Sequence, residues 1–301
     1  MNNGFNIIRT VEPNETVISW EEAIYQDIEQ FRKEGKSIVI GSERNTEEEL
    51  SELKQVYENL INQMLENTDG SDLQKALFLH NYLLANVEYP NIKLRKEEDN
   101  SKRPIIDRTN RVEENYSTPY GVLINKKALC SGIADTINLV LNDSRINVPS
   151  KKVSAYSISD HGKVGHAWNI VYIDGIPYQL DTTHDIIKNP SSIKIFNDPS
   201  KVFEDVENEI VGAKATRFSD KRFLVDDQQF MQDHIWQGDY PVCSKKYSRD
   251  EVSNAMEELK QAGIAFNYDQ PIKNNFKKET NKPKKVNQAN KNVADIDNER
   301  T

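Results

Sequence analysis

Three residues that could together activate a thiol follow one another along the chain, in the order Cys130, His166 and Asp181. Cys130 stands at the head of a predicted helix, His166 opens a predicted strand, and Asp181 closes the next strand. Side chains at element ends can converge, and a thiol becomes a strong nucleophile when a base and a carboxylate that orients the base lie beside it. The sequence therefore predicts a catalytic triad with Cys130 as nucleophile, His166 as base and Asp181 as orienting residue.

The predicted helix has apolar residues at helical spacing after Cys130, namely Ile133, Ile137, Val140 and Leu141. This periodicity indicates a helix with one buried face. The unpaired backbone N–H groups and the positive dipole end at its start both favour a thiolate at Cys130. The same N–H groups could hold the oxyanion of a tetrahedral intermediate. We therefore expect a central helix that presents the nucleophile at its N-terminus.

A hairpin is expected to bring the other two residues together. The pattern predicts strands over 152–156, 166–173 and 176–182. Asp174-Gly175 lies between the last two strands and is a strong signal for a tight turn. Pairing about this turn sets His166 opposite about position 183, so Asp181 should lie within one or two residues of it.

Composition limits the function classes that are open to the chain. Its 301 residues could form one large or two small domains, and a hydrophobic fraction of 37% with 29% charged residues favours a single well-buried core. The net charge of −9 argues against a nucleic-acid partner. With only Cys130 and Cys243, a dense disulfide framework is excluded. A single bridge between them is the alternative to a reduced, nucleophilic Cys130.

The sequence carries no signal for membrane insertion or secretion. The N-terminus lacks a basic segment followed by an apolar run. No apolar run approaches the roughly 20 residues that a membrane-spanning helix needs. We expect a cytoplasmic protein, or one exported without a recognisable signal peptide.

Four regions are predicted along the chain. They are an N-terminal helical region with a short strand (1–70), a catalytic domain (71–245), a C-terminal helix with a possible edge strand (246–270) and a disordered Asn/Lys-rich tail (271–301). Further helices are expected over 20–34, from about 46 to 66 and from 72 to 87, and further strands over 37–40, 223–225 and 264–266. Residues 91–117 read as a long exposed loop that either flanks a substrate groove or is a mobile insertion.

Capping boxes mark the starts of three of the predicted helices. The hydroxyl residues are Thr46, Ser71 and Ser248, each followed three residues later by Glu or Gln. Of the remaining histidines, His80 lies on the apolar face of its helix and is expected to be a hydrogen-bonded core residue. His161 and His234 are predicted to be solvated loop residues outside the catalytic set.

Four short segments together resemble the transglutaminase-like superfamily of papain-related thiol enzymes. They are 120–125 (YGVLIN), 130–135 (CSGIAD), 165–169 (GHAWN) and 181–185 (DTTHD). The resemblance covers roughly residues 72–185 and continues more weakly through 222–227 and 233–236, which are similar to the closing segments of bacterial members. It implies an α+β, papain-like fold with the nucleophile helix packed on an antiparallel β-sheet, and it carries the triad onto Cys130, His166 and Asp181.

The chain also departs from the family pattern. The usual Asp-Pro-Thr-Trp-Asp appears as 181–185 with His184 in place of tryptophan, which makes His184 a rival base and a candidate for the substrate cleft. Tyr120 is a second cleft candidate, which either supports the oxyanion site or merely packs. Trp168 is a third, as core residue or as cleft wall.

The predicted reaction is acyl transfer from an amide bond of a protein or peptide through a thioester. It needs no metal and no organic cofactor. The acceptor stays open: water makes the protein a peptidase or amidase, which the resemblance slightly favours, or a deamidase, whereas a lysine amine makes it a cross-linking transglutaminase. A catalytically inactive protein-binding domain is the alternative from another class.

Overall fold

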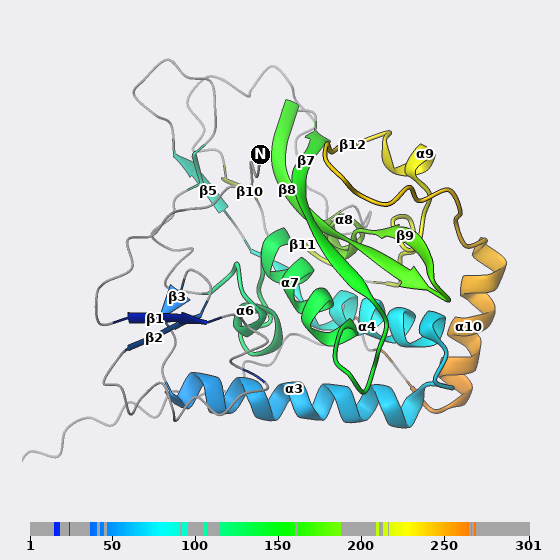
Figure 1. Ribbon diagram of the computed structural model, residues 1–301, viewed down its shortest axis with the longest axis horizontal. Coiled ribbons are helices and arrows are strands. Elements are labelled where there is room, and N and C mark those ends of the chain that lie inside the picture. Colours follow the sequence, from blue (N-terminus) through cyan, green and yellow to red (C-terminus); the bar gives the residue numbers. More distant parts are fainter. Residues whose placement is uncertain are drawn as a thin grey trace, which may run out of the picture.

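The protein has an α+β architecture with one central antiparallel sheet, as seen in the computed structural model (Figure 1). The structure describes residues 15–18, 24, 37–40, 43–44, 47–90, 92–95, 105–106, 115–159, 162–187, 209–210, 213–215, 217–264, 266 and 268. The predicted tail and His161 lie outside these residues. Among the described helices, none is long and apolar enough to cross a membrane.

The central sheet has the strand order β12-β7-β8-β9, with every neighbour antiparallel. Its strands are β7 (Ser150–Ser159), β8 (Gly162–Ile173), β9 (Ile176–Leu180) and β12 (His234–Ile235). Asp174 and Gly175 link β8 to β9 with φ of 51° and 76°, the left-handed conformation that a two-residue hairpin turn requires. Asn169 pairs with Leu180, so the predicted hairpin register is confirmed.

One expectation about this sheet is wrong. His166 does not open a strand but lies four residues inside β8, because β7 and β8 stay paired from Ser150↔Val171 to Ser159↔Gly162. Pairing between β8 and β9 ends earlier, at Asn169, where the chain leaves β9 to form α8 (Thr182–Ile187). His166 therefore projects beside the end of β9 and close to Asp181.

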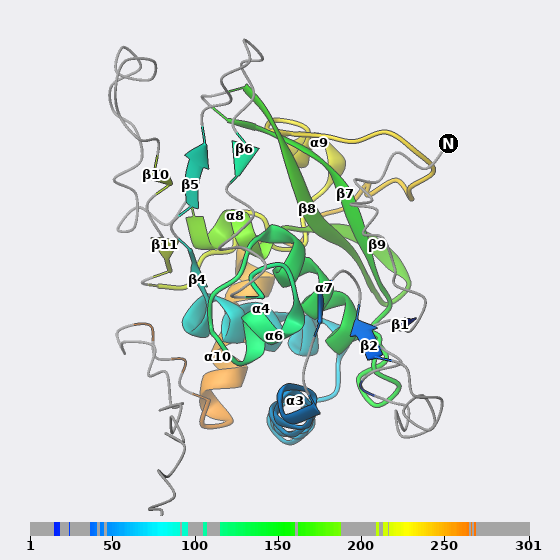
Figure 2. The same ribbon diagram turned by 90° about the vertical axis from the view of Figure 1, so that its left-hand side faces the viewer.

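The helix that starts at Cys130, α7 (Cys130–Leu141), packs on β7 and β8 as the sequence predicts. Its apolar residues join one core with those of α3 (Glu47–Asn67), α4 (Asp72–Asn86) and α10 (Arg249–Gln261). Figure 2, which views α3 nearly end-on, shows α4, α6 (Pro119–Leu123) and α7 between α3 and the sheet. This layering holds the N-terminus of α7 against the sheet. The domain boundaries predicted from the sequence stay predictions.

The N-terminal part forms a small sheet of its own. β1 (Glu15–Ile18) pairs in parallel with β2 (Ser37–Ile40), which pairs antiparallel with β3 (Glu43–Arg44). The predicted strand over 37–40 is thus confirmed. Of the predicted helix 20–34, only Ile24 is among the described residues, and it is buried in the main core.

The segment 91–117 is not the unbroken loop that its composition suggests. β5 (Ile92–Arg95) pairs with β6 (Ile105–Ile106) and with β10 (Glu209–Ile210), while β4 (Glu88–Tyr89) pairs with β11 (Ala213–Lys214). Only these strands and residues 115–117 of the region are described, so its part in a substrate groove stays a prediction.

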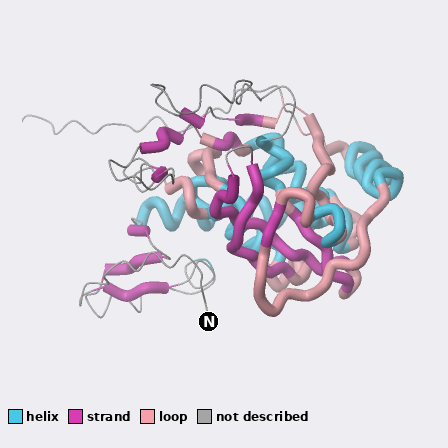
Figure 3. The backbone as a smooth tube through the Cα atoms, turned by 90° about the horizontal axis from the view of Figure 1, so that it is seen from above, coloured by secondary structure: helices cyan, strands magenta, loops and turns pink. Residues whose placement is uncertain are grey.

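The predicted strand at 223–225 is not present, and of the predicted strand 264–266 the described residues Ile264 and Phe266 are not in a strand. Val225 makes only a single bridge to Gln179, because Leu224 adopts a positive φ of 50° that ends any ladder. Ile264 and Phe266 pack against the core outside any strand. The segment around α9 (Asp227–Phe230) and β12 is largely loop, and Figure 3 draws such loops and turns in pink between the helices and strands.

Candidate active site

Cys130 is the first residue of α7 and is half-buried. Its predecessor Leu129 occupies the N-cap position without a side-chain cap hydrogen bond. The first backbone N–H groups of a helix have no acceptor within the helix, so the thiol lies at the positive end of the helix dipole. The placement predicted from the sequence is therefore present.

Gly132 allows the start of α7 to lie against the preceding segment. A Cβ at this position would come within 2.8 Å of the Tyr116 carbonyl oxygen and 2.9 Å of the Thr118 nitrogen. Both are backbone atoms that cannot rotate away. The small residue after Ser131 thus fixes how closely α7 approaches α6, whose N-cap is Thr118.

His166 Nε2 lies 2.7 Å from Asp181 Oδ2, a direct hydrogen bond between side chains. His166 also interacts with Cys130, and each of these two side chains shifts the pKa of the other. Because Asp181 occupies Nε2, Nδ1 is the ring nitrogen left to exchange a proton with the thiol. The fold thus brings together the three residues that the sequence singled out.

The electrostatics of this pair favour charge separation. Burial by itself would raise the pKa of the Cys130 thiol, but the hydrogen bond and charge of His166 and the Ala167 backbone lower it overall. Burial would lower the pKa of His166, yet Asp181 and Cys130 together raise it well above its ordinary value. The pair therefore favours thiolate and imidazolium over thiol and neutral imidazole.

Asp181 is buried and accepts three hydrogen bonds. Oδ2 accepts from His166 at 2.7 Å and from His234 Nε2 at 3.0 Å, and Oδ1 accepts from the His184 backbone N–H at 3.0 Å. Burial alone would raise the pKa of this carboxyl, but the two histidines hold it well below its usual range. Asp181 is thus a fixed carboxylate.

His234 is the residue that the sequence analysis missed. It was expected in a solvated loop, but it lies on β12 and is only 1% exposed. Burial results because β12 pairs with β7, with His234 opposite Ser157, and the Phe230 ring stacks on the imidazole at 3.9 Å between centroids. The motif at 233–236 was the available signal, but a lone histidine outside regular periodicity gives no sign of burial.

Two further charged residues, Asp233 and Arg222, extend the cluster beyond His234. Asp233 Oδ1 lies 2.6 Å from His234 Nδ1, and Arg222 Nη2 donates to Asp233 Oδ2 at 2.6 Å. These contacts hold the pKa of Asp233 at about 2, although burial acts in the opposite direction. The carboxylate of Asp233 therefore pairs with a histidine and an arginine at once.

His184, the rival base, lies at the margin of this cluster. Its Nδ1 is 3.7 Å from Asp233 Oδ2, and burial lowers the pKa of its ring to about 4. A mostly neutral imidazole could accept a proton, but its nearest ionic partner is Asp233. The residue that contacts Cys130 is His166.

The two aromatic cleft candidates, Tyr120 and Trp168, are both buried. The Tyr120 hydroxyl donates to Glu52 of α3 at 3.0 Å, and the residue belongs to the main core. Trp168 is 1% exposed, donates to Gln179 and lies 5.9 Å from the His166 ring between centroids. We therefore describe Tyr120 as a core residue and Trp168 as the buried backing of His166.

His80, on α4, contacts the candidate site through Thr182, the residue next to Asp181. It is buried, with Nδ1 2.9 Å from the Thr182 hydroxyl and Nε2 2.8 Å from the Ser219 carbonyl oxygen. Burial lowers the pKa of His80 to about 4, so the ring is neutral. It is the hydrogen-bonded core residue that the helical pattern predicts, and it anchors the residue next to Asp181.

Two groups of potential metal ligands occur among the described residues. They are His166, Asp181 and His234, and His184, Asp233 and His234. Donor atoms around a tetrahedral zinc at about 2.0–2.1 Å would be about 3.3 Å apart. The separations of 2.7 and 3.0 Å in the first group, and of 2.6 Å between His234 Nδ1 and Asp233 Oδ1 in the second, are instead those of direct hydrogen bonds. Protons therefore account for that geometry.

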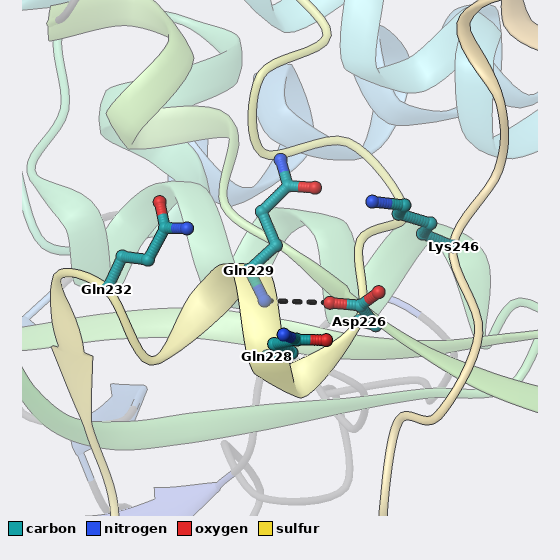
Figure 4. A pocket seen from close by; sticks show the side chains of 5 residues that line it. All are labelled: Asp226, Gln228, Gln229, Gln232 and Lys246. Atoms are coloured by element: carbon teal, nitrogen blue, oxygen red, sulfur yellow. Dashed lines mark hydrogen bonds between the residues drawn. The ribbon is translucent and has the colours of Figure 1, made fainter.

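A surface hollow of about 310 Å³ lies beside α9 (Figure 4). Polar side chains line this hollow, and the backbone N–H of Gln229 donates to the Asp226 carboxylate, which also lines it. The residues that line it are Asp226, Gln228, Gln229, Gln232 and Lys246. None of the triad residues is among them, so this hollow is separate from the reacting groups.

The second cysteine differs from the first in every relevant respect. Cys243 is buried in the smaller core with Trp168 and Phe230, and it is not bridged to Cys130. Burial and Asp227 raise the pKa of its thiol to about 12. One thiol is thus activated by its surroundings and the other suppressed.

Comparison with known proteins adds little to this geometry. No protein-family model and no curated protein matches the chain. A solved structure described as "Crystal structure of a TGase" is 20% identical, with a TM-score of 0.32, over 46% of this chain and 33% of that one. The chain thus spans about a third of the length of that structure. Neither a family nor an activity follows from a match at this level, so function must be inferred from the site itself.

Proposed function

We propose that this protein is a thiol acyl-transfer enzyme that acts on amide bonds of proteins or peptides, with a papain-like use of its helix-borne cysteine. The observation that carries the proposal is the 2.7 Å hydrogen bond between His166 and Asp181, with Cys130 at the start of α7 and its pKa lowered by the same imidazole. A thiol at a helix N-terminus, beside an imidazole that a buried carboxylate orients, has the parts of an activated nucleophile.

In this mechanism the Cys130 thiolate attacks the amide carbonyl carbon. The helix N-terminus stabilises the negative oxygen that develops. His166, protonated on Nδ1, gives this proton to the departing amine as the C–N bond breaks, which leaves a thioester on Cys130. Asp181 holds the Nε2–H of His166 and balances the imidazolium charge.

We propose water as the acceptor, so that the protein is a cysteine peptidase or amidase. His166 then removes a proton from the water that attacks the thioester, and the carboxylic acid leaves as the Cys130 thiolate and the protonated His166 are restored. Water can reach the reacting groups because Cys130 is half-buried and the His166 side chain is 11% exposed. With an amine as acceptor the same residues would give a transglutaminase.

The first test measures the alkylation rate of Cys130 against pH by peptide mass spectrometry, in the wild type and in His166→Ala. An ordinary thiol titrates at about pH 8.5. We expect Cys130 to react well below that pH in the wild type only, with the buried Cys243 as a slow internal control. Ordinary behaviour of Cys130 in the wild type would overturn the proposal and favour a protein-binding domain without catalysis.

The second test separates the acceptors. A glutamine-containing protein substrate is incubated with a labelled primary amine, and released ammonia, cleaved peptide and incorporated label are measured together. Peptide cleavage or ammonia release without label supports hydrolysis. Label incorporation that Cys130→Ala abolishes would replace hydrolase by transglutaminase.

A further inference from the structure

His234 stands between two carboxylates, one on each of its ring nitrogens. Nε2 is 3.0 Å from Asp181 Oδ2, and Nδ1 is 2.6 Å from Asp233 Oδ1. An ionised carboxylate can only accept hydrogen bonds. Both ring nitrogens must therefore carry protons, which makes the ring of His234 an imidazolium cation.

The described residues that pack on the faces of this cation are uncharged aromatic rings. Its side chain is completely shielded from solvent. Phe230 stacks on one face at 3.9 Å, and the Trp168 ring meets it edge-on at 5.1 Å between centroids. A buried charge is tolerated only when it is paired and hydrogen-bonded. The two carboxylates supply both conditions.

The charged groups that face His234 act in opposite directions. Burial alone would lower the pKa of its ring, and the hydrogen bonds to Asp181 and Asp233 raise it overall. The His166 ring, 5.4 Å away between centroids, opposes protonation when it is charged itself. The His184 ring lies 6.0 Å away and is mostly neutral because burial depresses its pKa. The two carboxylates therefore have the larger effect, and the pKa of His234 is raised.

Arg222 adds one more positive charge to this cluster through its ion pair with Asp233. The order from the reacting atom outward is thiolate, imidazolium, carboxylate, imidazolium, carboxylate and guanidinium. Each neighbour has the opposite sign, so the cluster is neutral as a whole although most of its groups are buried.

We propose that His234 is a positioning residue, a buried cation that fixes the Asp181 carboxylate against His166 and adds positive charge behind the triad. This inference rests on the proposed function, in which Asp181 orients the base. Since both histidines donate to the same oxygen of Asp181, and the His184 backbone holds the other oxygen, the carboxylate cannot rotate without losing a bond. The second histidine thereby sets the direction in which His166 points.

The protonation state can be tested without any substrate. Nitrogen-15 NMR of the histidine rings in the full chain, assigned with His234→Gln, should show both nitrogens of His234 protonated at pH 7.5. Its titration should lie above the ordinary value of about 6.5. A ring with one bare nitrogen at pH 7.5 would overturn the inference. Asp233→Asn, at a partly exposed position, should lower the pKa of His234 by about one unit or more.

The positioning role is tested by the pH profile of Cys130 alkylation in His234→Gln. The lower inflection reports thiolate formation and the upper one reports loss of the His166 proton. A nearby positive charge lowers both pKa values, so its removal should move both inflections upward, by about one unit. Ile235→Gln, the same change at the next strand position with a side chain 38% exposed, should leave both in place.

The possible failures are distinguishable. If wild-type Cys130 reacts like an ordinary thiol, the proposed function fails, whatever NMR shows for His234. If the wild-type thiol is activated but His234→Gln loses only amplitude, without a shift of either inflection, His234 has a merely structural role. If His234→Gln does not fold, Asp233→Asn decides by NMR: a lowered pKa of His234 supports the inference, and an unchanged pKa overturns it.

Discussion

His166 Nε2 and Asp181 Oδ2 are 2.7 Å apart, although 15 residues separate them along the chain. Their contact follows from the register of one hairpin. Asn169 is the last residue of β8 to pair with β9, and the chain then turns into α8 so that Asp181 reaches back beside the unpaired part of β8. The end of β9 thus places the Asp181 carboxylate beside the His166 imidazole.

Asp181→Asn should weaken activation of the thiol while keeping the fold. The amide can still accept from His166, but it loses the negative charge that raises the pKa of His166. The thiolate–imidazolium pair should become scarce, and the alkylation rate of Cys130 at pH 6 should fall by about 10- to 100-fold. At pH 9.5 the two proteins should react at similar rates. An unchanged rate at pH 6 would show that Asp181 does not act on the pair.

Asp185→Asn, four residues further along the chain, should leave the reactivity of Cys130 unchanged, in contrast to Asp181→Asn. Burial raises the pKa of Asp185 to about 7. The Ser219 hydroxyl donates to Asp185 Oδ1 at 2.7 Å, and the Arg222 backbone N–H donates to Oδ2 at 3.0 Å. A hydroxyl can rotate to accept instead when the group that faces it carries a proton. Asparagine offers the same donor and acceptor, so the fold and the reactivity of Cys130 should be kept.

The sign of the pH effect follows from proton uptake on folding. The unfolded carboxyl titrates at about 3.9 and the folded one at about 7, so the folded state binds the extra proton between these values. This contribution to stability is complete below pH 4 and is lost as pH rises toward 7. Urea unfolding should show Asp185→Asn gaining stability relative to the wild type from pH 5 to pH 8. A constant difference would contradict the raised pKa.

Gly132→Ala should destabilise the protein and disturb the nucleophile together. The new Cβ would meet backbone atoms of Tyr116 and Thr118 at 2.8 to 3.0 Å, which forces α7 away from α6. Overpacking of this kind costs about 1–3 kcal/mol. Urea unfolding gives the cost, and Cys130 alkylation at pH 6 should slow as well. Ser131→Ala, at a buried hydroxyl with no hydrogen-bond partner among the described residues, is the stability control and should cost much less.

Ser248→Ala should reduce stability without touching the chemistry. Ser248 and Glu251 form a complete capping box at the start of α10, with bonds of 3.2 and 2.8 Å. Loss of an N-cap costs about 1 kcal/mol. The variant should unfold at lower urea, with an alkylation profile of Cys130 that superimposes on the wild type. A changed profile would mean that α10 is coupled to the site.

Local rules explain the parts of the molecule that could be predicted. Helical spacing after Cys130 predicts α7, the Asp174-Gly175 pair predicts the hairpin and its register, and the Ser248 capping box predicts where α10 begins. Each depends on residues a few positions apart, whose backbone preferences act before any tertiary contact forms.

Distant contacts explain what the sequence did not reveal. His234 is buried because β12 pairs with β7 and Phe230 covers its ring, and it meets Asp181 from 53 residues away. The strand expected at 223–225 is reduced to one bridge at Val225. The order of Cys130, His166 and Asp181, and the helix and strands that carry them, follow from local sequence patterns alone. Which further groups surround these residues depends on burial and on pairing across the sheet, because the packing partners involved leave no periodic trace in the chain.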